Sequence, residues 1–196
     1  MTMHIPAPSD ETMARLRTDL AERAAQRGLL DVAYAAVDSP VGPLTISVTD
    51  RGVVRIAYDN ERLEDVLDEL AAKVSPRILH APARLDPARR ELDEYFAGQR
   101  TVFDLPLDWT LTRGFRREVL KATARIPYAG TTTYNEIAAA AGSPRAFRAA
   151  GTALATNPIP IIVPCHRVLP ASGAIGGYRG GSTRKQQLLR LESRQV

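Results

Sequence analysis

The single cysteine of this 196-residue chain, Cys165, lies in the stretch PCHRV, directly before His166. A thiol becomes a useful nucleophile when its pKa falls and a base lies within reach. His166 offers that base, Arg167 adds positive charge, and the apolar run IPIIV at 159–163 would bury the approach to the sulfur. Free cysteines are also common as buried, inert side chains. The residue types alone therefore leave a nucleophile and a structural cysteine both open.

Composition narrows the class of protein. With one cysteine the chain can form neither an internal disulfide nor a multi-cysteine metal site. No apolar run reaches the length of a membrane span, and the N-terminus lacks the basic-then-apolar pattern of a signal peptide. We therefore expect a cytoplasmic globular protein that has no membrane partner and uses neither a metal nor another cofactor.

Charge is distributed unevenly along the chain. Residues 1–100 carry 13 Lys and Arg against 17 Asp and Glu, a net charge of −4, whereas residues 101–196 carry 13 against 5, a net charge of +8. Concentrated cations favour contact with a polyanion such as nucleic acid. After residue 112, arginines outnumber lysines 11 to 2, and the guanidinium fork matches phosphate geometry. A solvated basic surface is the alternative interpretation.

The elements that must position the cysteine begin with two N-terminal parts. Residues 1–31 are expected to form an extension with one amphipathic helix, with Ser9 as its N-cap and Gly28 at its end. One apolar stripe on this helix should pack against the body or a partner; its residues are Met13, Leu16, Leu20 and Ala24. Residues 32–108 predict an α+β unit. Its expected elements are an antiparallel meander at 31–37, 43–49 and 53–58, helices at 60–74 and 86–99, the latter capped by Asp86, and an irregular connection at 75–85.

Residues 109–196 change to a mostly helical pattern. We expect a helix capped by Thr112 and running to 126, a second at 132–142, and a third at 143–156 with Ser143 as its N-cap. Two short helices joined by a Gly-containing turn have the outline of a helix-turn-helix. The third helix has a face of small residues beside two arginines: Ala146, Ala149, Ala150, Gly151 and Ala153, with Arg145 and Arg148. Core packing and close approach to a DNA groove both explain that face.

A wider set of motifs around the cysteine has the spacing of a known family. PCHRV follows Asn157 by eight positions and precedes SG at 172–173, GYRGG at 177–181 and RKQQLLRLE at 184–192. Upstream motifs continue in order: DSPVGPLTIS at 38–47, ELDEYFAG at 91–98, FRREVLKA at 115–122, IPYAGTTTYNEIA at 126–138 and RAAG at 148–151. Over residues 32–193 the chain resembles the O6-alkylguanine-DNA alkyltransferases, also called methylated-DNA–protein-cysteine methyltransferases. PCHRV followed by GYRGG is a highly specific signature.

The resemblance implies an α+β fold and a repair activity. The N-terminal antiparallel sheet with helices would be a ribonuclease H-like roll, and a winged-helix or helix-turn-helix-like domain would bind DNA and carry the active site. The protein would bind double-stranded DNA in the minor groove, flip out O6-alkylguanine, chiefly O6-methylguanine, and transfer the alkyl group irreversibly to its own cysteine. Flipping is needed because a stacked O6 atom is out of reach of an in-line thiolate. We expect a monomer, with assembly along DNA left open.

The resemblance also assigns roles to individual residues. Cys165 would be the alkyl acceptor, His166 would deprotonate it through a bound water, and Glu192 would orient the histidine. Tyr134 would donate a proton or hydrogen bond as guanine leaves, and Asn157 would hold the turn before the cysteine.

Further matched positions would bind substrate or DNA. Those expected to line, brace or read the base pocket are Tyr178, Pro160, Val168, Ser172, Lys185 and Arg179. The long side chain of Arg179 stands where small residues are frequent, so it would narrow the range of alkyl groups or contact a phosphate. On the DNA side, Arg148 would fill the gap in the base stack, and the groove surface would include Arg145, Ala149, Gly151 and Thr133.

Three other functions are compared with this one. An alkyltransferase-like lesion binder without transfer activity shares the fold but lacks the acceptor cysteine, so Cys165 argues against it. An ordinary helix-turn-helix regulator gives no role to Glu192 or Tyr178. A cysteine hydrolase would need an oxyanion-hole motif, and the sequence supplies none.

Overall fold

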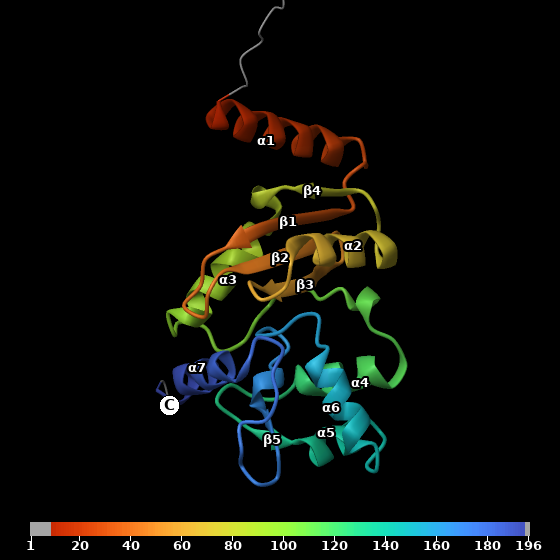
Figure 1. Ribbon diagram of the computed structural model, residues 1–196, viewed down its shortest axis with the longest axis vertical. Helices are drawn as coiled ribbons and strands as arrows, with labels where there is room; N and C mark the ends of the chain where they lie inside the picture. The colour runs from red at the N-terminus through yellow and green to blue at the C-terminus, as the bar shows by residue number, and fades with distance from the viewer. Residues whose placement is uncertain (1–8, 195–196) are drawn as a thin grey trace, which may run out of the picture.

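The structure, a computed structural model, describes residues 9–194. Part of the expected N-terminal extension, residues 1–8, lies outside the described residues. A sheet with its helices forms one half of the molecule and a group of short helices forms the other, while α1 (Asp10–Gln26) lies across the far end of the sheet half (Figure 1). This arrangement confirms the expected α+β class. Within residues 9–194, no helix is both long and apolar enough to cross a bilayer.

Helix α1 packs on the body only through its last turns. The Ser9 side chain accepts a hydrogen bond from the backbone of Thr12, as an N-cap does. Ala21 and Ala24 are buried, whereas Leu16 and Leu20 are 51% and 55% exposed. The expected apolar stripe is therefore divided: its C-terminal end contacts the sheet half and its leucines face outwards.

The sheet has four strands in the order β3-β2-β1-β4. The expected meander is present as β1 (Val32–Val37), β2 (Leu44–Thr49) and β3 (Gly52–Tyr58), each antiparallel to the next. The expectation of an irregular connection at 75–85 was wrong, because it contains β4 (Ile78–His80), parallel to β1, and a 3-10 helix η1 (Pro82–Leu85). A three-residue strand is too short for alternation to reveal it, and its pairing depends on a distant partner.

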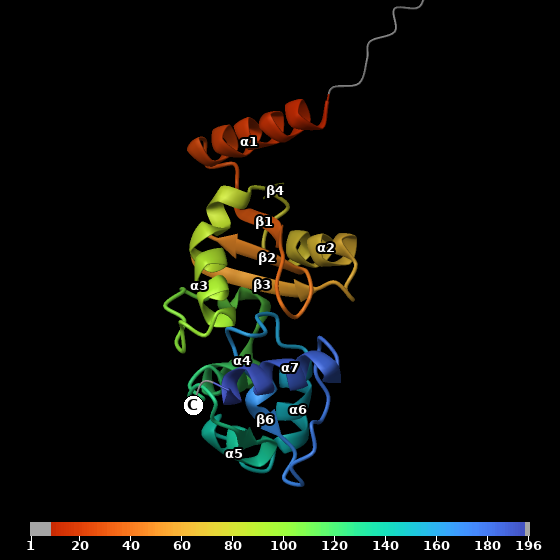
Figure 2. The same cartoon turned by 90° about the vertical axis from the view of Figure 1, so that its left-hand side faces the viewer.

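Two helices cover opposite faces of the sheet (Figure 2). Helix α2 (Leu63–Lys73) packs Val66 and Leu70 into one core, and α3 (Asp86–Phe96) packs Leu92 and Tyr95 into the other. Asp86 is not the N-cap of α3: η1 runs directly into the helix, so Leu85 holds the cap position and Asp86 lies in the first turn. The carboxylate still faces the positive end of the helix dipole.

The edge of β3 joins the two halves. The Val53 amide donates to the Pro106 carbonyl at 2.9 Å, and the Ile56 amide donates to the Pro158 carbonyl at 2.8 Å. Gly52 is needed here, because its φ is +125° and a Cβ would lie 2.0 Å from the Pro106 oxygen. The segment that leads to the cysteine is thus bonded directly to the sheet.

The C-terminal half is built from short helices around a two-stranded parallel ladder. Its elements in chain order are η2 (Trp109–Leu111), α4 (Gly114–Thr123), β5 (Thr132–Thr133), α5 (Tyr134–Ala140), α6 (Phe147–Ala155), η3 (Cys165–Arg167), β6 (Val168–Leu169) and α7 (Ser182–Ser193). Helices α4, α5 and α6 pack on one another, and β5 pairs with β6.

Two expected caps in this half were wrong. The Thr112 hydroxyl donates to the Trp109 carbonyl, and Arg113 holds the N-cap position of α4. Ser143 lies in a turn closed by a bond from the Ala146 amide to the Ser143 carbonyl, so α6 begins only at Phe147. Tight turns compete locally with helix initiation, which the cap preferences of single residues do not reveal.

The small residues of α6 serve two surfaces. Ala150 and Ala153 are buried, whereas Ala149 and Arg148 are exposed. One face of this helix therefore packs in the core, and the other faces outwards, where close approach to a DNA groove stays a prediction.

Candidate functional site

Cys165 is the first residue of η3 and follows a buried segment that begins at Asn157. The Asn157 side-chain amide donates to the Val163 carbonyl at 2.9 Å and contacts the Cys165 sulfur at 3.1 Å. The amide oxygen accepts from the Ile159 backbone at 3.0 Å. One buried side chain therefore shapes the turn and points an N–H donor at Sγ.

The thiol of Cys165 is protonated in the resting protein. Burial raises its pKa to about 11, although the hydrogen bond from Asn157 and the nearby charge of Lys185 oppose that rise. Desolvation therefore outweighs the neighbouring positive charge, and the charge of Arg167 pairs with Glu192. The sulfur needs a base before it can act as a nucleophile.

His166 is a buried base with one nitrogen available. Its Nε2 lies 2.8 Å from Glu192 Oε1, and neither side chain is more than 1% exposed. Burial lowers the pKa of His166 even though Glu192 opposes that effect, so the imidazole is neutral at pH 7. With the proton on Nε2 facing the carboxylate, Nδ1 carries the lone pair. Within the described residues, Nδ1 is buried and has no hydrogen-bond partner.

Glu192, on α7, is the centre of a buried polar network. Its carboxylate accepts from Arg167 Nε and Nη2, both at 2.9 Å, and from the Tyr95 hydroxyl at 2.7 Å. Burial raises the pKa of Glu192, but the hydrogen bonds from His166 and Arg167 outweigh it and lower that pKa to about 2. The carboxylate is thus always charged near neutral pH and fixes the orientation of the imidazole.

Sequence reasoning missed two members of this network. Arg167 stands in the PCHRV motif itself, where it was assigned only a charge. Tyr95 lies on α3 in the sheet half, 97 positions from Glu192. No local pattern links such distant residues, so only the packing of the two halves brings the phenol to the carboxylate.

Cys165 borders a cavity of about 300 Å³. Its lining residues come from α5, α6 and the segment before α7: Tyr134, Gly151, Leu154, Ala155, Cys165, Gly177, Tyr178 and Arg179. Four of the predicted site residues besides the cysteine are thus gathered here, together with Gly177 of the GYRGG motif, while Leu154 and Ala155 were not foreseen. Burial and the nearby Cys165 raise the pKa of Tyr134, so its hydroxyl stays protonated and can donate.

Other predicted residues surround this cavity as supports. Buried Lys185 donates from Nζ to the Val168 carbonyl at 2.7 Å, which ties α7 to β6. Thr133 caps α5 through a capping box with Glu136 and so places Tyr134 in the first helical turn. Pro160 is buried and Ser172 is exposed, and neither is among the lining residues.

The N-terminal end of α6 presents an exposed basic surface. Arg145 and Arg148 are both exposed, as is Ala149, and the Arg148 guanidinium lies 5.7 Å from the centre of the Phe147 ring. Gly151, one turn further along, lies close enough that an added Cβ would be 3.8 Å from the Tyr134 ring. Basic surface and cavity are therefore carried by the same short helix.

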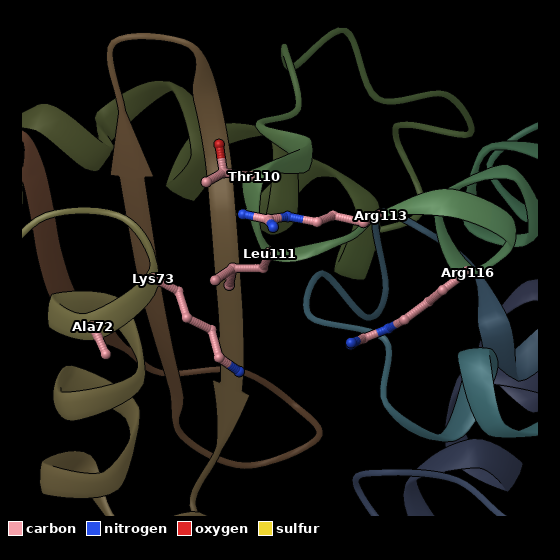
Figure 3. Close-up of a pocket in the computed structure, with 6 residues that line it drawn as sticks. All are labelled: Ala72, Lys73, Thr110, Leu111, Arg113 and Arg116. Carbon is pink, nitrogen blue, oxygen red and sulfur yellow. The ribbon is translucent and has the colours of Figure 1, made fainter.

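A larger cavity of about 530 Å³ lies between α2 and α4 (Figure 3). It is lined by Ala72, Lys73, Thr110, Leu111, Arg113 and Arg116. These lining residues include neither a cysteine nor a histidine. Of these two cavities, the smaller one has a nucleophile, Cys165, in its wall, and the base His166 follows it in the chain.

Comparisons with known proteins agree with this geometry. Residues 32–109 match the ribonuclease-like domain of 6-O-methylguanine DNA methyltransferase, and residues 114–194 match its DNA binding domain. The chain is 43% identical over 159 residues to the methylated-DNA–protein-cysteine methyltransferase of Mycobacterium bovis, covering 81% of this chain and 91% of that protein. It is 37% identical over 163 residues to the constitutive enzyme of that name from Bacillus subtilis, covering 81% and 94%.

Solved structures give the same answer for the fold. The crystal structure of Mycobacterium tuberculosis OGT in complex with DNA is 39% identical, has a TM-score of 0.72, and is matched over 84% of this chain and 94% of that chain. Since both halves match in order and the relatives are covered almost completely, the chain belongs to the 6-O-methylguanine DNA methyltransferase family.

Proposed function

We propose that this protein repairs DNA by transferring the alkyl group of O6-alkylguanine to Cys165 in a single, irreversible turnover. The observation that carries the proposal is a protonated, buried thiol next in the chain to His166, whose Nδ1 has no hydrogen-bond partner among residues 9–194 and whose ring a charged Glu192 orients. The names of the relatives and the OGT–DNA complex support the same activity and the same partner.

Transfer would begin with removal of the thiol proton. A water between Cys165 and His166 Nδ1 takes the proton from Sγ and passes one to the imidazole, and Glu192 stabilises the imidazolium that forms. The thiolate then attacks the alkyl carbon in line with the C–O6 bond. A new S–C bond forms as the C–O6 bond breaks, and its electron pair stays on guanine O6.

Tyr134 would assist the departing base. Tyr134 lines the cavity and its hydroxyl is protonated, so it can donate to the ring as negative charge develops on guanine. The product on the protein is a thioether, which has no labile proton or acyl carbon. No group in the site can remove the alkyl group again, so the protein is consumed in the reaction.

The exposed end of α6 would contact DNA in the minor groove. Arg148 would enter the base stack where the flipped guanine leaves a gap, and Arg145 would contact a phosphate. The small side chains of Ala149 and Gly151 allow the helix to approach the groove closely. We expect a monomer in solution and leave assembly along DNA open.

Intact-mass spectrometry tests the proposal. Wild-type protein incubated with excess duplex oligonucleotide that contains O6-methylguanine should gain the mass of one methyl group and then stop, whereas Cys165→Ser should gain none. No gain on the wild type, with binding to the lesion retained, would instead identify a lesion-binding protein without transfer activity.

A further inference from the structure

The turn between β3 and α2 holds one wall of the cavity. We call residues 58–61 the β3–α2 turn and residues 176–181 the pocket loop. Glu61 Oε2 accepts from Arg179 Nη2 at 2.6 Å and from Nε at 3.0 Å, and the Asn60 side chain donates to the Arg179 carbonyl at 3.2 Å. The hydroxyls of Tyr58 and Tyr178 lie 2.6 Å apart. Both held residues, Tyr178 and Arg179, line the cavity.

Contact between these two segments is close as well as polar. A Cβ at Gly180 would lie 2.8 Å from the ring of Tyr58, which is itself only 2% exposed. Just beyond the loop, Arg184 pairs with Asp59 at 2.6 Å and stacks 5.1 Å from the centre of the Tyr58 ring. The pocket loop is therefore attached to the sheet half at Tyr178 and Arg179, two of its three lining residues, and again just beyond the loop at Arg184.

Glu61 is itself fixed from the other side. Arg55, which is 1% exposed, donates from Nη2 to Glu61 Oε2 at 2.5 Å, and the Tyr58 amide lies 3.3 Å from Oε1. Burial raises the pKa of Glu61, but the bond from Arg179 and the charge of Arg55 outweigh it and lower that pKa. The charged carboxylate thus stands between a buried arginine of the sheet and the arginine of the cavity wall.

We propose that Glu61 is a positioning residue that fixes the cavity wall through Arg179 and so limits the size of the alkyl group that Cys165 accepts. The inference rests on the proposed alkyl transfer and adds a determinant in the other half of the molecule. Two N–H groups of the Arg179 guanidinium donate to the same Glu61 oxygen, and such charge-assisted hydrogen bonds hold the side chain in one geometry along the wall. The pocket loop contains four glycines at 176, 177, 180 and 181. Because glycine has wide backbone freedom, the loop can change conformation readily once its hydrogen bonds to Glu61 are lost.

The test compares single-turnover rates for duplexes that carry O6-methylguanine or O6-benzylguanine. For Glu61→Gln, we expect methyl transfer to slow about tenfold, because a wall displaced by a fraction of an ångström loses the reactive geometry. Benzyl transfer should slow less, so that the benzyl-to-methyl rate ratio rises at least threefold. Glu64→Gln is the matched control, since Glu64 is 74% exposed on the first turn of α2 and pairs with the exposed Arg62 at 3.9 Å; its ratio should equal that of the wild type.

A double-mutant cycle separates positioning from general stability. Glu61→Gln added to Arg179→Ala should change the ratio no further, because the contact is already lost. The final extent of alkylation measures the active fraction of each variant. Rates are normalised to this fraction, so loss of folded protein does not change them. Tyr58→Phe removes only the hydrogen bond between the Tyr58 and Tyr178 hydroxyls and should also raise the benzyl-to-methyl rate ratio. This variant provides the test if Glu61→Gln does not fold.

The outcomes are distinct. If the wild type transfers methyl groups and both Glu61→Gln and Tyr58→Phe keep the wild-type ratio, the inference is wrong and the turn only stabilises the fold. A wild type that transfers nothing would overturn the proposed function together with the inference.

Discussion

Replacing Glu192 with Gln removes one charge from the buried network and keeps its shape. The amide can still contact His166 and Tyr95, but Arg167, which is 5% exposed, loses the only carboxylate with which it forms an ion pair among the described residues. The imidazole also loses the negative charge that would stabilise its protonated form. We therefore expect Glu192→Gln to lower both stability and reaction rate.

The loss of stability follows from the lowered pKa of Glu192. The carboxyl titrates at about 2 in the folded protein and at 4.5 when unperturbed, which corresponds to about 3 kcal/mol at roughly 1.4 kcal/mol per pKa unit. Because the folded pKa is the lower one, this stabilisation is fully present above about pH 4.5 and is lost as the pH falls towards 2. The gap between wild type and variant should therefore shrink from about 3 kcal/mol at pH 7 to roughly 1 kcal/mol at pH 3.

Urea unfolding of both proteins at pH 7, 5, 4 and 3 measures that gap. Glu118→Gln is the control, since Glu118 is 55% exposed and its nearest lysine, Lys121, lies 3.7 Å away; it should change stability by less than about 1 kcal/mol at every pH. Methyl transfer by folded Glu192→Gln should be slower by a factor on the order of 10² to 10⁴, because the base His166 loses the carboxylate that orients it and stabilises the imidazolium. A gap that is constant with pH, or below about 1 kcal/mol at pH 7, would refute the reasoning.

Three further predictions concern the cysteine, its turn and the basic end of α6. Iodoacetamide should label Cys165 slowly at pH 7 and faster up to an apparent pKa of about 11, and stability relative to Cys165→Ser should fall between about pH 9 and 11, since the unfolded thiol ionises first; a labelling rate that levels off near pH 8.5 would contradict the burial argument. Asn157→Ala leaves the Ile159 amide and the Val163 carbonyl without their buried side-chain partner, so urea unfolding should show a loss of about 2 to 4 kcal/mol, and a loss below 1 kcal/mol would mean that the turn closes without it. Arg148→Ala should slow repair of duplex DNA far more than transfer from the free modified base, whereas Arg190→Ala, an exposed arginine on α7, should leave both rates close to wild type; equal losses on the two substrates would remove the role of Arg148 in the base stack.

Local pattern was enough to predict most elements of the fold. The strands at 31–37, 43–49 and 53–58 have clear turns between them, and the face of Val66 and Leu70 repeats with the helical period, so neighbouring residues carry the information. Prediction failed for β4, whose pairing with β1 depends on a partner more than 40 residues away. It failed also at the starts of α4 and α6, where turns replaced the expected caps.

The sequence by itself determined the family and the set of residues available for chemistry. Asn157, PCHRV, GYRGG and Glu192 all stand in one continuous stretch, residues 157–192, so their spacing can be followed along the chain. The tertiary structure decided how those residues behave. Desolvation makes the thiol a weak acid and the histidine neutral, and no local pattern measures burial. The supports from the sheet half, Tyr95 beneath Glu192 and Glu61 beside Arg179, became visible only once the two halves were packed together, because a contact between residues about 100 positions apart leaves no periodic trace in the chain.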